Sequence, residues 1–157
     1  MIDDVGFTQR TKAPKIDVLD RADGERLEEL ARNIVDCGFA LHDDLGPGLL
    51  ESAYESFLAA ALRDRGFGVE QQRSVAVTYK GVAIKAAFRI DLLVEGQLIV
   101  ELKSVERLSP VHAKQLLTYL RLTGSPLGLL FNFGEALFKN GVKRVINDRS
   151  SYRAPQT

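Results

Sequence analysis

The stretch FRIDLLVEGQLIVELK, residues 88–103, decides the fold of this chain. It consists of two apolar segments separated by Glu95-Gly96-Gln97, and this arrangement predicts two antiparallel strands joined by a tight turn. Each segment carries one carboxylate in its interior, Asp91 in the first and Glu101 in the second. A carboxylate inside an apolar strand is costly unless it has partners, so both residues are candidates for a functional site.

The register of these two strands decides whether the two carboxylates meet. Pairing of Val94 with Leu98 across a three-residue loop places Asp91 opposite Glu101. A two-residue loop would instead send the two carboxylates to opposite faces of the sheet. We predict the first register, with Gly96 in the left-handed conformation that three-residue hairpins need.

Outside this stretch, the hydrophobic period predicts the remaining elements. The expected order is helices at 25–44 and 49–65, strands at 69–79, 82–94 and 98–104, a helix from Pro110 to Gly124 capped by Ser109, a strand at 126–133, and an edge strand or short helix at 141–146. Helices and strands that mix in this order predict an α/β fold.

The length and composition of the chain predict a single globular domain. A chain of 157 residues suits one core, and 45% hydrophobic with 27% charged residues excludes disordered, fibrous and disulfide-scaffold classes. We expect a loosely ordered arm at 1–24, one domain at 25–150 and a tail at 151–157. Without a run of about 18 apolar residues or a leader pattern, we expect no membrane segment and a cytoplasmic location.

The charge of the chain is balanced in sum and polarised along its length. It has 21 basic and 21 acidic residues, which at face value disfavours binding to nucleic acid. Residues 1–70 nevertheless carry a net charge of −7, and residues 71–157 a net charge of +7. Two interpretations stay open: the first helices carry solvated acidic faces, or the C-terminal half lines a surface for an anionic partner.

Two opposed carboxylates with a lysine one step along the strand are the minimum for an oxygen-rich metal site. Mg²⁺ and Mn²⁺ prefer one or two carboxylates together with water and substrate phosphate. The alternative is an ordinary charged cluster on a solvated face of the sheet. The apolar residues 98–100 before Glu101 favour an interior strand over that alternative.

Several motifs of this chain together resemble a known family. Asp91, followed ten residues later by Glu101-Leu102-Lys103, resembles the core of the PD-(D/E)xK nuclease superfamily, although Ile90 stands where the name of the superfamily puts proline. The segment 48–54, GLLESAY, is similar to the pattern that names the GxxExxY protein family, a bacterial branch of that superfamily. The segments that resemble the rest of that pattern are 88–93, 100–103 and 110–120, and the similarity covers roughly 28–146. The resemblance implies a restriction-endonuclease-like αβββαβ core, with a mixed sheet flanked by helices.

The resemblance also implies which residues form the site. The catalytic residues would be Glu51, Asp91, Glu101, Lys103 and Gln115. The metal ligands would be Asp91, Glu101, the backbone carbonyl of Leu102 and, as a further candidate, Glu51. In this arrangement Glu51 supports the metal site from the second helix, Lys103 lies beside the attacking water, and Gln115 is placed against the site.

The chemistry of lysine limits the role of Lys103. A lysine that acts as a general base near pH 7 must lose about three pKa units, which costs about 4 kcal/mol. The neighbouring Asp91 and Glu101 oppose that loss, although a bound cation would reduce their effect. We therefore expect a charged Lys103 that orients water and neutralises phosphate charge.

Four further side chains have two interpretations. His112, Gln115 and Tyr119 share one face of a helix and would frame the scissile phosphate, or Tyr119 is a core residue and His112 lies at a polar boundary. Tyr54 lies three residues after Glu51 and would form a hydrogen bond with it, or would belong to the core.

The leading hypothesis is a Mg²⁺- or Mn²⁺-dependent nuclease that hydrolyses phosphodiester bonds of nucleic acid, with DNA favoured over RNA. A homodimer is one assembly that would cut both strands. The alternatives are a non-catalytic module that keeps the fold and binds nucleic acid, and a protein-interaction subunit whose acidic first helix docks a basic partner. Metal-dependent cleavage distinguishes the first hypothesis from the other two.

Overall fold

The computed structural model describes residues 21–149 of the chain. The helices are α2 (Arg21–Leu45), α3 (Glu51–Asp64), α4 (Pro110–Thr123) and the short 3₁₀ helix η1 (Phe138–Gly141). The strands are β1 (Val69–Tyr79), β2 (Val82–Val94), β3 (Leu98–Lys103), β4 (Leu127–Asn132) and β5 (Val142–Ile146). Helix α2 begins at Arg21, so the last residues of the arm expected at 1–24 are helical, whereas its residues 1–20 and the expected tail lie outside the described residues.

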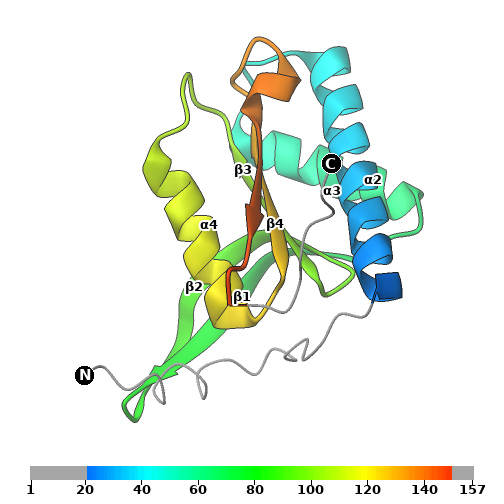
Figure 1. Ribbon diagram of the computed structural model, residues 1–157. Coiled ribbons are helices and arrows are strands. Elements are labelled where there is room, and N and C mark those ends of the chain that lie inside the picture. The colour runs from blue at the N-terminus through cyan, green and yellow to red at the C-terminus, as the bar shows by residue number, and fades with distance from the viewer. Residues whose placement is uncertain (1–20, 150–157) are drawn as a thin grey trace.

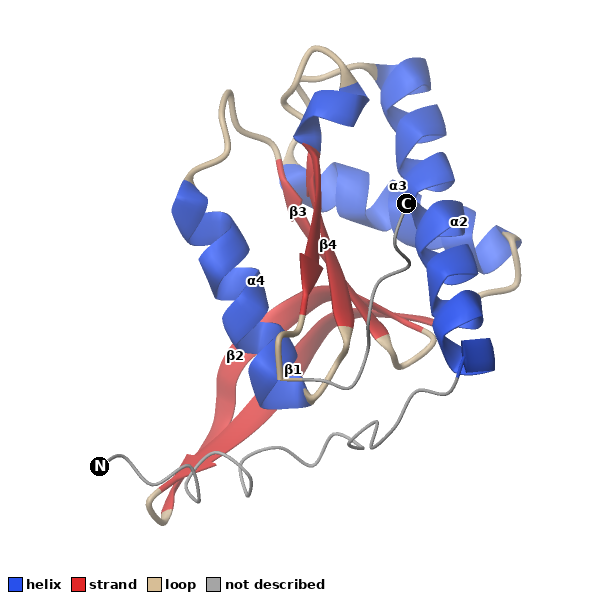
Figure 2. Cartoon of the chain, in the orientation of Figure 1, coloured by secondary structure: helices blue, strands red, loops and turns tan. Residues whose placement is uncertain are grey.

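The five strands form one mixed sheet in the order β1-β2-β3-β4-β5. Strands β3 and β4 are parallel, and the other neighbours are antiparallel. Helix α4 provides the crossover that a parallel pair requires. Figures 1 and 2 show α4 on one side of the sheet and α2 with α3 on the other. This arrangement confirms the predicted α/β fold with a mixed sheet flanked by helices.

Each face of the sheet has its own apolar core. On the α2 and α3 face, Val100 and Leu102 of β3 pack with buried helix residues such as Ile34 and Leu58. On the α4 face, Ile99 packs with a smaller group that includes residues of α4 and β4. Strand β3 is therefore buried on both sides, which explains its nearly continuous apolar sequence.

Tyr54 fixes the loop that precedes α3. Its ring is buried and stacks on Phe133 with 4.4 Å between the ring centroids. Its hydroxyl donates to the carbonyl of Gly46 at 2.5 Å and accepts from the backbone N–H of Leu49 at 3.1 Å. Tyr54 is thus a core residue and not a partner of Glu51, and it holds the loop from which α3 begins.

Helix α4 begins where the sequence predicted. The Ser109 hydroxyl accepts from the N–H of Val111, and Nδ1 of His112 accepts from the N–H of Ser109 at 3.2 Å. These bonds form a capping box, which satisfies N–H groups at the start of the helix. His112 is therefore used in the cap, and the helix ends at Gly124 in the left-handed conformation.

The β1–β2 hairpin changes sides near Asp91. Leu92 and Val94 of β2 belong to the core under α2 and α3, whereas Phe88 and Ile90 belong to the core under α4. A regular strand would keep these alternate residues on one face. The hairpin instead twists at Asp91, and its distal part projects beyond the helices (Figure 1).

No helix in the described range 21–149 combines the length and the apolar character needed to cross a membrane.

Candidate active site

The β2–β3 hairpin has the predicted register. Val94 pairs with Leu98 across the three-residue loop, and Gly96 has a φ of 64°, as this type of loop requires. The sequence did not reveal that Glu95 is also left-handed, with a φ of 54°. This register places Asp91 opposite Glu101 and confirms the predicted alignment of the two strands.

The backbone pairing of β2 with β3 stops just before the two carboxylates. The last paired residues are Leu92 and Val100. Beyond them, Oδ2 of Asp91 accepts from the N–H of Leu102 at 2.9 Å, and the N–H of Asp91 donates to Oε1 of Glu101 at 3.2 Å. The carboxylates therefore join the strands at the point where their backbones separate.

Glu101 is buried next to a second acid. Glu101 is only 7% exposed. This burial confirms that β3 is an interior strand and not part of a solvated charged face of the sheet. Burial, followed by repulsion from Asp91, raises the pKa of Glu101 to about 9, although the charge of Lys103 opposes this shift. Burial and the neighbouring Asp91 therefore favour the protonated form of Glu101.

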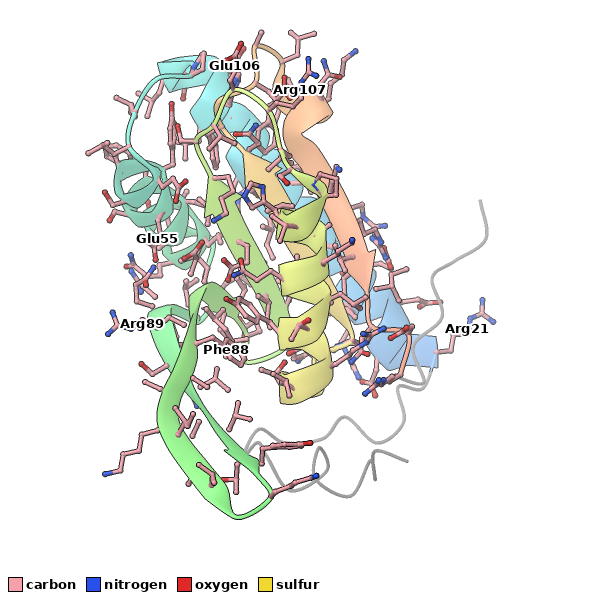
Figure 3. All side chains as sticks on the ribbon, turned by 90° about the vertical axis from the view of Figure 1, so that its left-hand side faces the viewer. Arg21, Glu55, Phe88, Arg89, Glu106 and Arg107 are labelled. Carbon is pink, nitrogen blue, oxygen red and sulfur yellow. The ribbon has the colours of Figure 1, made fainter. Side chains whose placement is uncertain are left out.

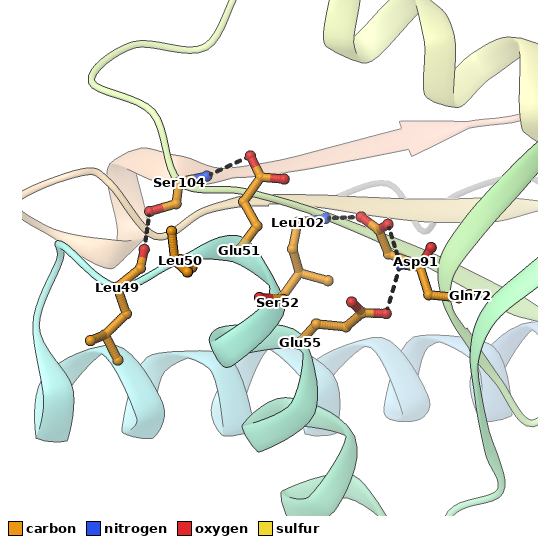
Figure 4. A pocket seen from close by; sticks show the side chains of 9 residues that line it. All are labelled: Leu49, Leu50, Glu51, Ser52, Glu55, Gln72, Asp91, Leu102 and Ser104. Carbon is orange, nitrogen blue, oxygen red and sulfur yellow. Dashed lines mark hydrogen bonds between the residues drawn. The ribbon is translucent and has the colours of Figure 1, made fainter.

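A cavity of about 490 Å³ opens between α3 and the ends of β1, β2 and β3. Its lining residues are Leu49, Leu50, Glu51, Ser52, Glu55, Gln72, Asp91, Leu102 and Ser104. Figure 4 shows the carboxylates of Glu51 and Glu55 directed from α3 toward the strands that carry Asp91 and Leu102. Three carboxylates from two elements therefore line this cavity.

Glu55 is a site residue that the sequence analysis missed. It lies one turn after Glu51 and is 8% exposed. Nε2 of Gln72 donates to Oε1 of Glu55 at 2.9 Å and to Oδ1 of Asp91 at 3.1 Å, so one amide joins both acids. Burial, and then repulsion from Asp91 and Glu51, raise the pKa of Glu55 against the hydrogen bond from Gln72. The spacing of four residues from Glu51 was the available signal.

Glu51 lies at the other end of the cavity, in the first turn of α3. Its Oε1 accepts from the N–H of Ser104 at 3.3 Å, directly after β3. The hydroxyl of Ser104 donates to the carbonyl of Leu49 at 2.7 Å, which ties the loop before α3 to the end of β3. A carboxylate at a helix N-terminus is also favoured by the helix dipole.

Lys103 and Gln115 lie on the α4 side. Because Ile99 packs against α4, the alternation of β3 places Glu101 and Lys103 on that same face. Lys103 is half-buried, and its charge acts on Glu101. Gln115 is exposed on α4 and does not line the cavity. The structure therefore brings Glu51, Asp91 and Leu102 to the cavity and Glu101 to Asp91, but it does not bring Gln115 there.

Tyr119 on α4 has a pKa that is affected by the acids of the site. Its ring stacks on Phe88 with 4.1 Å between centroids, so it belongs to the packing between α4 and the hairpin. Burial raises the pKa of its hydroxyl, and the charges of Glu101 and Asp91 add to that effect. The structure therefore supports the interpretation of Tyr119 as a packing residue, with its polar end near Glu101 and Asp91.

The donor set suits a hard divalent cation. Glu55 and Glu101 both have pKa values raised in part by Asp91, so a positive charge among these acids would relieve their repulsion. Within residues 21–149, no three His, Cys, Asp or Glu side chains gather closely enough to hold a metal ion. Two carboxylates with a backbone carbonyl are nevertheless the kind of incomplete set that Mg²⁺ completes with water and substrate phosphate.

A family model matches most of this chain. The family model described as the PD-(D/E)XK nuclease superfamily matches residues 28–145, from α2 into β5. Searches of curated proteins and of solved structures give no match. The matched region contains Glu51, Glu55, Asp91, Glu101 and Lys103.

Proposed function

Since this chain belongs to the PD-(D/E)XK nuclease superfamily, we propose that it hydrolyses phosphodiester bonds of DNA in a reaction that requires Mg²⁺ or Mn²⁺. Membership suggests nuclease activity on a nucleic acid, and members generally use divalent metal ions. The observation that carries the proposal is the meeting of Asp91 and Glu101 where β2 separates from β3, beside a solvent-accessible cavity.

The proposed ligands come from both sides of β3. Asp91, Glu101 and the carbonyl of Leu102 would hold the cation, with Glu51 as a further candidate, and we add Glu55 because it lines the same cavity as Asp91. When bound, the cation would lower the pKa of its water and polarise a phosphoryl oxygen. Repulsion between Asp91 and its neighbouring acids supports this role, because a cation would offset it.

The remaining residues would position the reactants. Lys103 would donate a hydrogen bond to the attacking water or to the scissile phosphate, where its charge would offset the developing negative charge. Gln72 holds Asp91 and Glu55 at a fixed separation through its amide. Gln115 stays in the proposal as a residue that contacts the bound phosphate from α4, since it is exposed there and free to face a substrate.

Three finer statements belong to this proposal. The net charge of +7 over residues 71–157 supports a polynucleotide substrate, and we favour DNA over RNA. Membership of the GxxExxY branch is supported by Glu51, which lines the cavity, and by Tyr54, which fixes the loop before it. One site per chain cuts one strand, so a homodimer that acts in the cytoplasm would complete double-strand cleavage.

Cleavage of supercoiled plasmid in Mg²⁺, Mn²⁺ or EDTA tests the proposal. We expect metal-dependent nicking, and we expect Asp91→Asn and Lys103→Ala each to lower its initial rate by at least about 100-fold. Asp64→Asn is the matched control, because Asp64 is exposed at the end of α3 and outside the cavity. A parallel assay with single-stranded and double-stranded RNA tests the preference for DNA.

Three results would contradict the proposal. One is the absence of metal-dependent cleavage of any nucleic acid, and another is equal activity of Asp91→Asn and the wild type. The third is salt-dependent binding without cleavage, which would identify a non-catalytic module that retains the nuclease fold.

A further inference from the structure

Residues 71–90 of the β1–β2 hairpin include basic residues and no acidic ones. Residues 71–90 contain Arg73, Lys80, Lys85 and Arg89, and no Asp or Glu. The whole chain has equal numbers of acidic and basic residues, so a segment of this length without a single acid is a local departure from its composition. The part of the hairpin between Glu70 and Asp91 is therefore a continuous positive element.

The distal part of this hairpin, which we name the β1–β2 ribbon (residues 76–87), projects into solvent. Figures 1 and 3 show it extending beyond α4 and the other helices. Every residue from Tyr79 to Ala87 is exposed, including Val82 at 65% and Ile84 at 54%. Neither face of the ribbon contributes to a core, so folding of the domain does not account for its length.

The ribbon is ordered in spite of its exposure. Its strands pair from Val77 with Ile84 to Tyr79 with Val82, and Lys80 and Gly81 form a two-residue turn with φ values of 47° and 80°. Positive φ at both positions is the type I′ geometry that matches the twist of a hairpin. The register shifts between Val75 and Val77, so the regular pairing that fixes the side chains covers residues 77–84, and Lys85 follows directly after it.

Its cations are available to a ligand. Lys80 lies 5.5 Å above the ring of Tyr79, and Lys85 is exposed without a salt bridge to any acid in residues 21–149. Arg89 at the base is also exposed, whereas Arg73 pairs with Glu70. Three of the four basic residues therefore have no acidic partner in the described chain.

We propose that the β1–β2 ribbon binds the phosphate backbone of a polynucleotide and holds it across the cavity. This inference rests on the proposed nuclease function. The two strands of the ribbon continue to Gln72 and Asp91, both of which line the cavity, so a polymer bound along the ribbon leads to the acids. The major groove of a DNA duplex admits a two-stranded ribbon, and each lysine or arginine that neutralises a phosphate releases a counterion.

The length of the ribbon sets the length of substrate that it can hold. Lys80 lies eight positions after Gln72 along β1, so at about 3.3 Å per residue the tip is at most about 26 Å from the cavity. That span corresponds to about eight base pairs. The ribbon therefore contacts DNA up to about eight base pairs to one side of the cleaved bond. A duplex that extends less far on that side loses the contribution of the ribbon to binding.

Two charge-matched double variants test the ribbon. K80A/K85A removes two cations from it, and K139A/K143A removes two exposed cations from η1 and β5 at the opposite end of the molecule (Figure 1). Binding of a labelled 30-base-pair duplex is measured by fluorescence anisotropy in EDTA over a range of salt concentrations. We expect K80A/K85A to weaken binding about tenfold and to lower the slope of log affinity against log salt by about 2. We expect K139A/K143A to bind as the wild type does.

Duplexes truncated on one side provide a second measurement. We expect the difference between K80A/K85A and the wild type to disappear when the truncated side is shorter than about eight base pairs. K80Q/K85Q, which keeps polar side chains, serves if the alanine variant does not fold. Far-ultraviolet circular dichroism and sedimentation of each variant check the fold and the oligomeric state.

The outcomes separate this inference from the proposed function. Equal effects of the two double variants, or an unchanged salt slope for K80A/K85A, would overturn the role of the ribbon. So would a change from dimer to monomer in K80A/K85A that fully accounts for its loss of affinity, because the ribbon would then join two copies. Because binding in EDTA requires no cleavage, ribbon-dependent binding without any nuclease activity contradicts only the proposed function.

Discussion

The two sides of β3 carry acids in different environments. On the α3 side, Glu51 and Glu55 line an open cavity and accept hydrogen bonds from the N–H of Ser104 and from Gln72. On the α4 side, Glu101 is buried next to Asp91, with a pKa raised to about 9. Asp91 belongs to both groups, because it lines the cavity and its N–H bonds to Glu101.

This difference shows that the two sides of β3 give their acids different electrostatic environments. The acids on the α3 side line an open cavity and accept hydrogen bonds, although burial raises the pKa of Glu55. Glu101 is buried and accepts a hydrogen bond from the N–H of Asp91, so a nearby positive charge would favour its ionised form. A cation bound at Asp91 would therefore matter most for Glu101, whose pKa is raised to about 9 by burial and by Asp91.

The largest expected effect distinguishes the two sides directly. Glu101→Gln mimics the protonated acid, and we expect it to lower the rate of DNA cleavage about 100-fold, because it removes a charge next to Asp91. Glu55→Gln should lower the rate only about tenfold, since Glu55 reaches Asp91 through Gln72. Initial rates of plasmid cleavage at saturating Mg²⁺ provide the measurement. A larger loss for Glu55→Gln would place the metal site in the cavity and leave Glu101 a structural role.

The second effect concerns stability and pH without metal. The pKa of Glu101 is near 9 in the folded chain, against about 4.5 when unfolded, so between these values the folded state binds more protons. Stability due to Glu101 therefore falls as pH rises from about 4.5 toward 9. We expect Glu101→Gln to be more stable than the wild type by less than about 1 kcal/mol at pH 5 and by about 3 kcal/mol at pH 7.

Urea unfolding in EDTA at both pH values measures this difference. Glu106→Gln, at an exposed position in the loop after β3, is the control for removing a glutamate charge. If the wild type and Glu101→Gln respond to pH in the same way, Glu101 is ionised in the folded protein, and the contrast between the two sides is lost.

The sequence predicted the α4 side of the site better than the cavity. The alignment of Asp91 with Glu101 follows from the loop around Gly96, because loop length and a left-handed residue determine hairpin register. The place of Glu55 in the site was not predicted, because one acid in an amphipathic helix resembles a solvated surface residue. The role of Gln72 could not be predicted, because an alternating strand pattern does not indicate that its backbone is left-handed, with a φ of 51°.

The twist of the hairpin could not be predicted from the pattern either. Phe88, Ile90, Leu92 and Val94 alternate without interruption, which predicts one buried face. Two different cores divide these residues at Asp91. Which core a residue joins depends on where α3 and α4 lie, and that is a property of the packed molecule and not of local sequence.

A third, smaller effect tests the support of the cavity. Tyr54→Phe keeps the stacking on Phe133 but leaves the carbonyl of Gly46 and the N–H of Leu49 without this partner. We expect a loss of about 1–2 kcal/mol in the free energy of unfolding and a lower rate of cleavage through displacement of Glu51. The pH dependence of stability should match the wild type, because Glu101 on the other side is untouched. A change in that dependence would mean that the two sides do not act separately.

The smallest effect tests Gln72, which joins the two acids that line the cavity. Its left-handed backbone suits asparagine and glycine, so Gln72→Asn and Gln72→Gly remove or shorten the amide without adding backbone strain. Without the bond to Gln72, Glu55 and Asp91 repel each other with less compensation. We expect a loss of cleavage of about three- to tenfold that higher Mg²⁺ concentration largely restores, since the cation replaces the missing positive end of the amide. A loss that no Mg²⁺ concentration restores would mean that Gln72 shapes the backbone at Asp91, and the cavity acids would then depend on the twist of the hairpin and not on the amide.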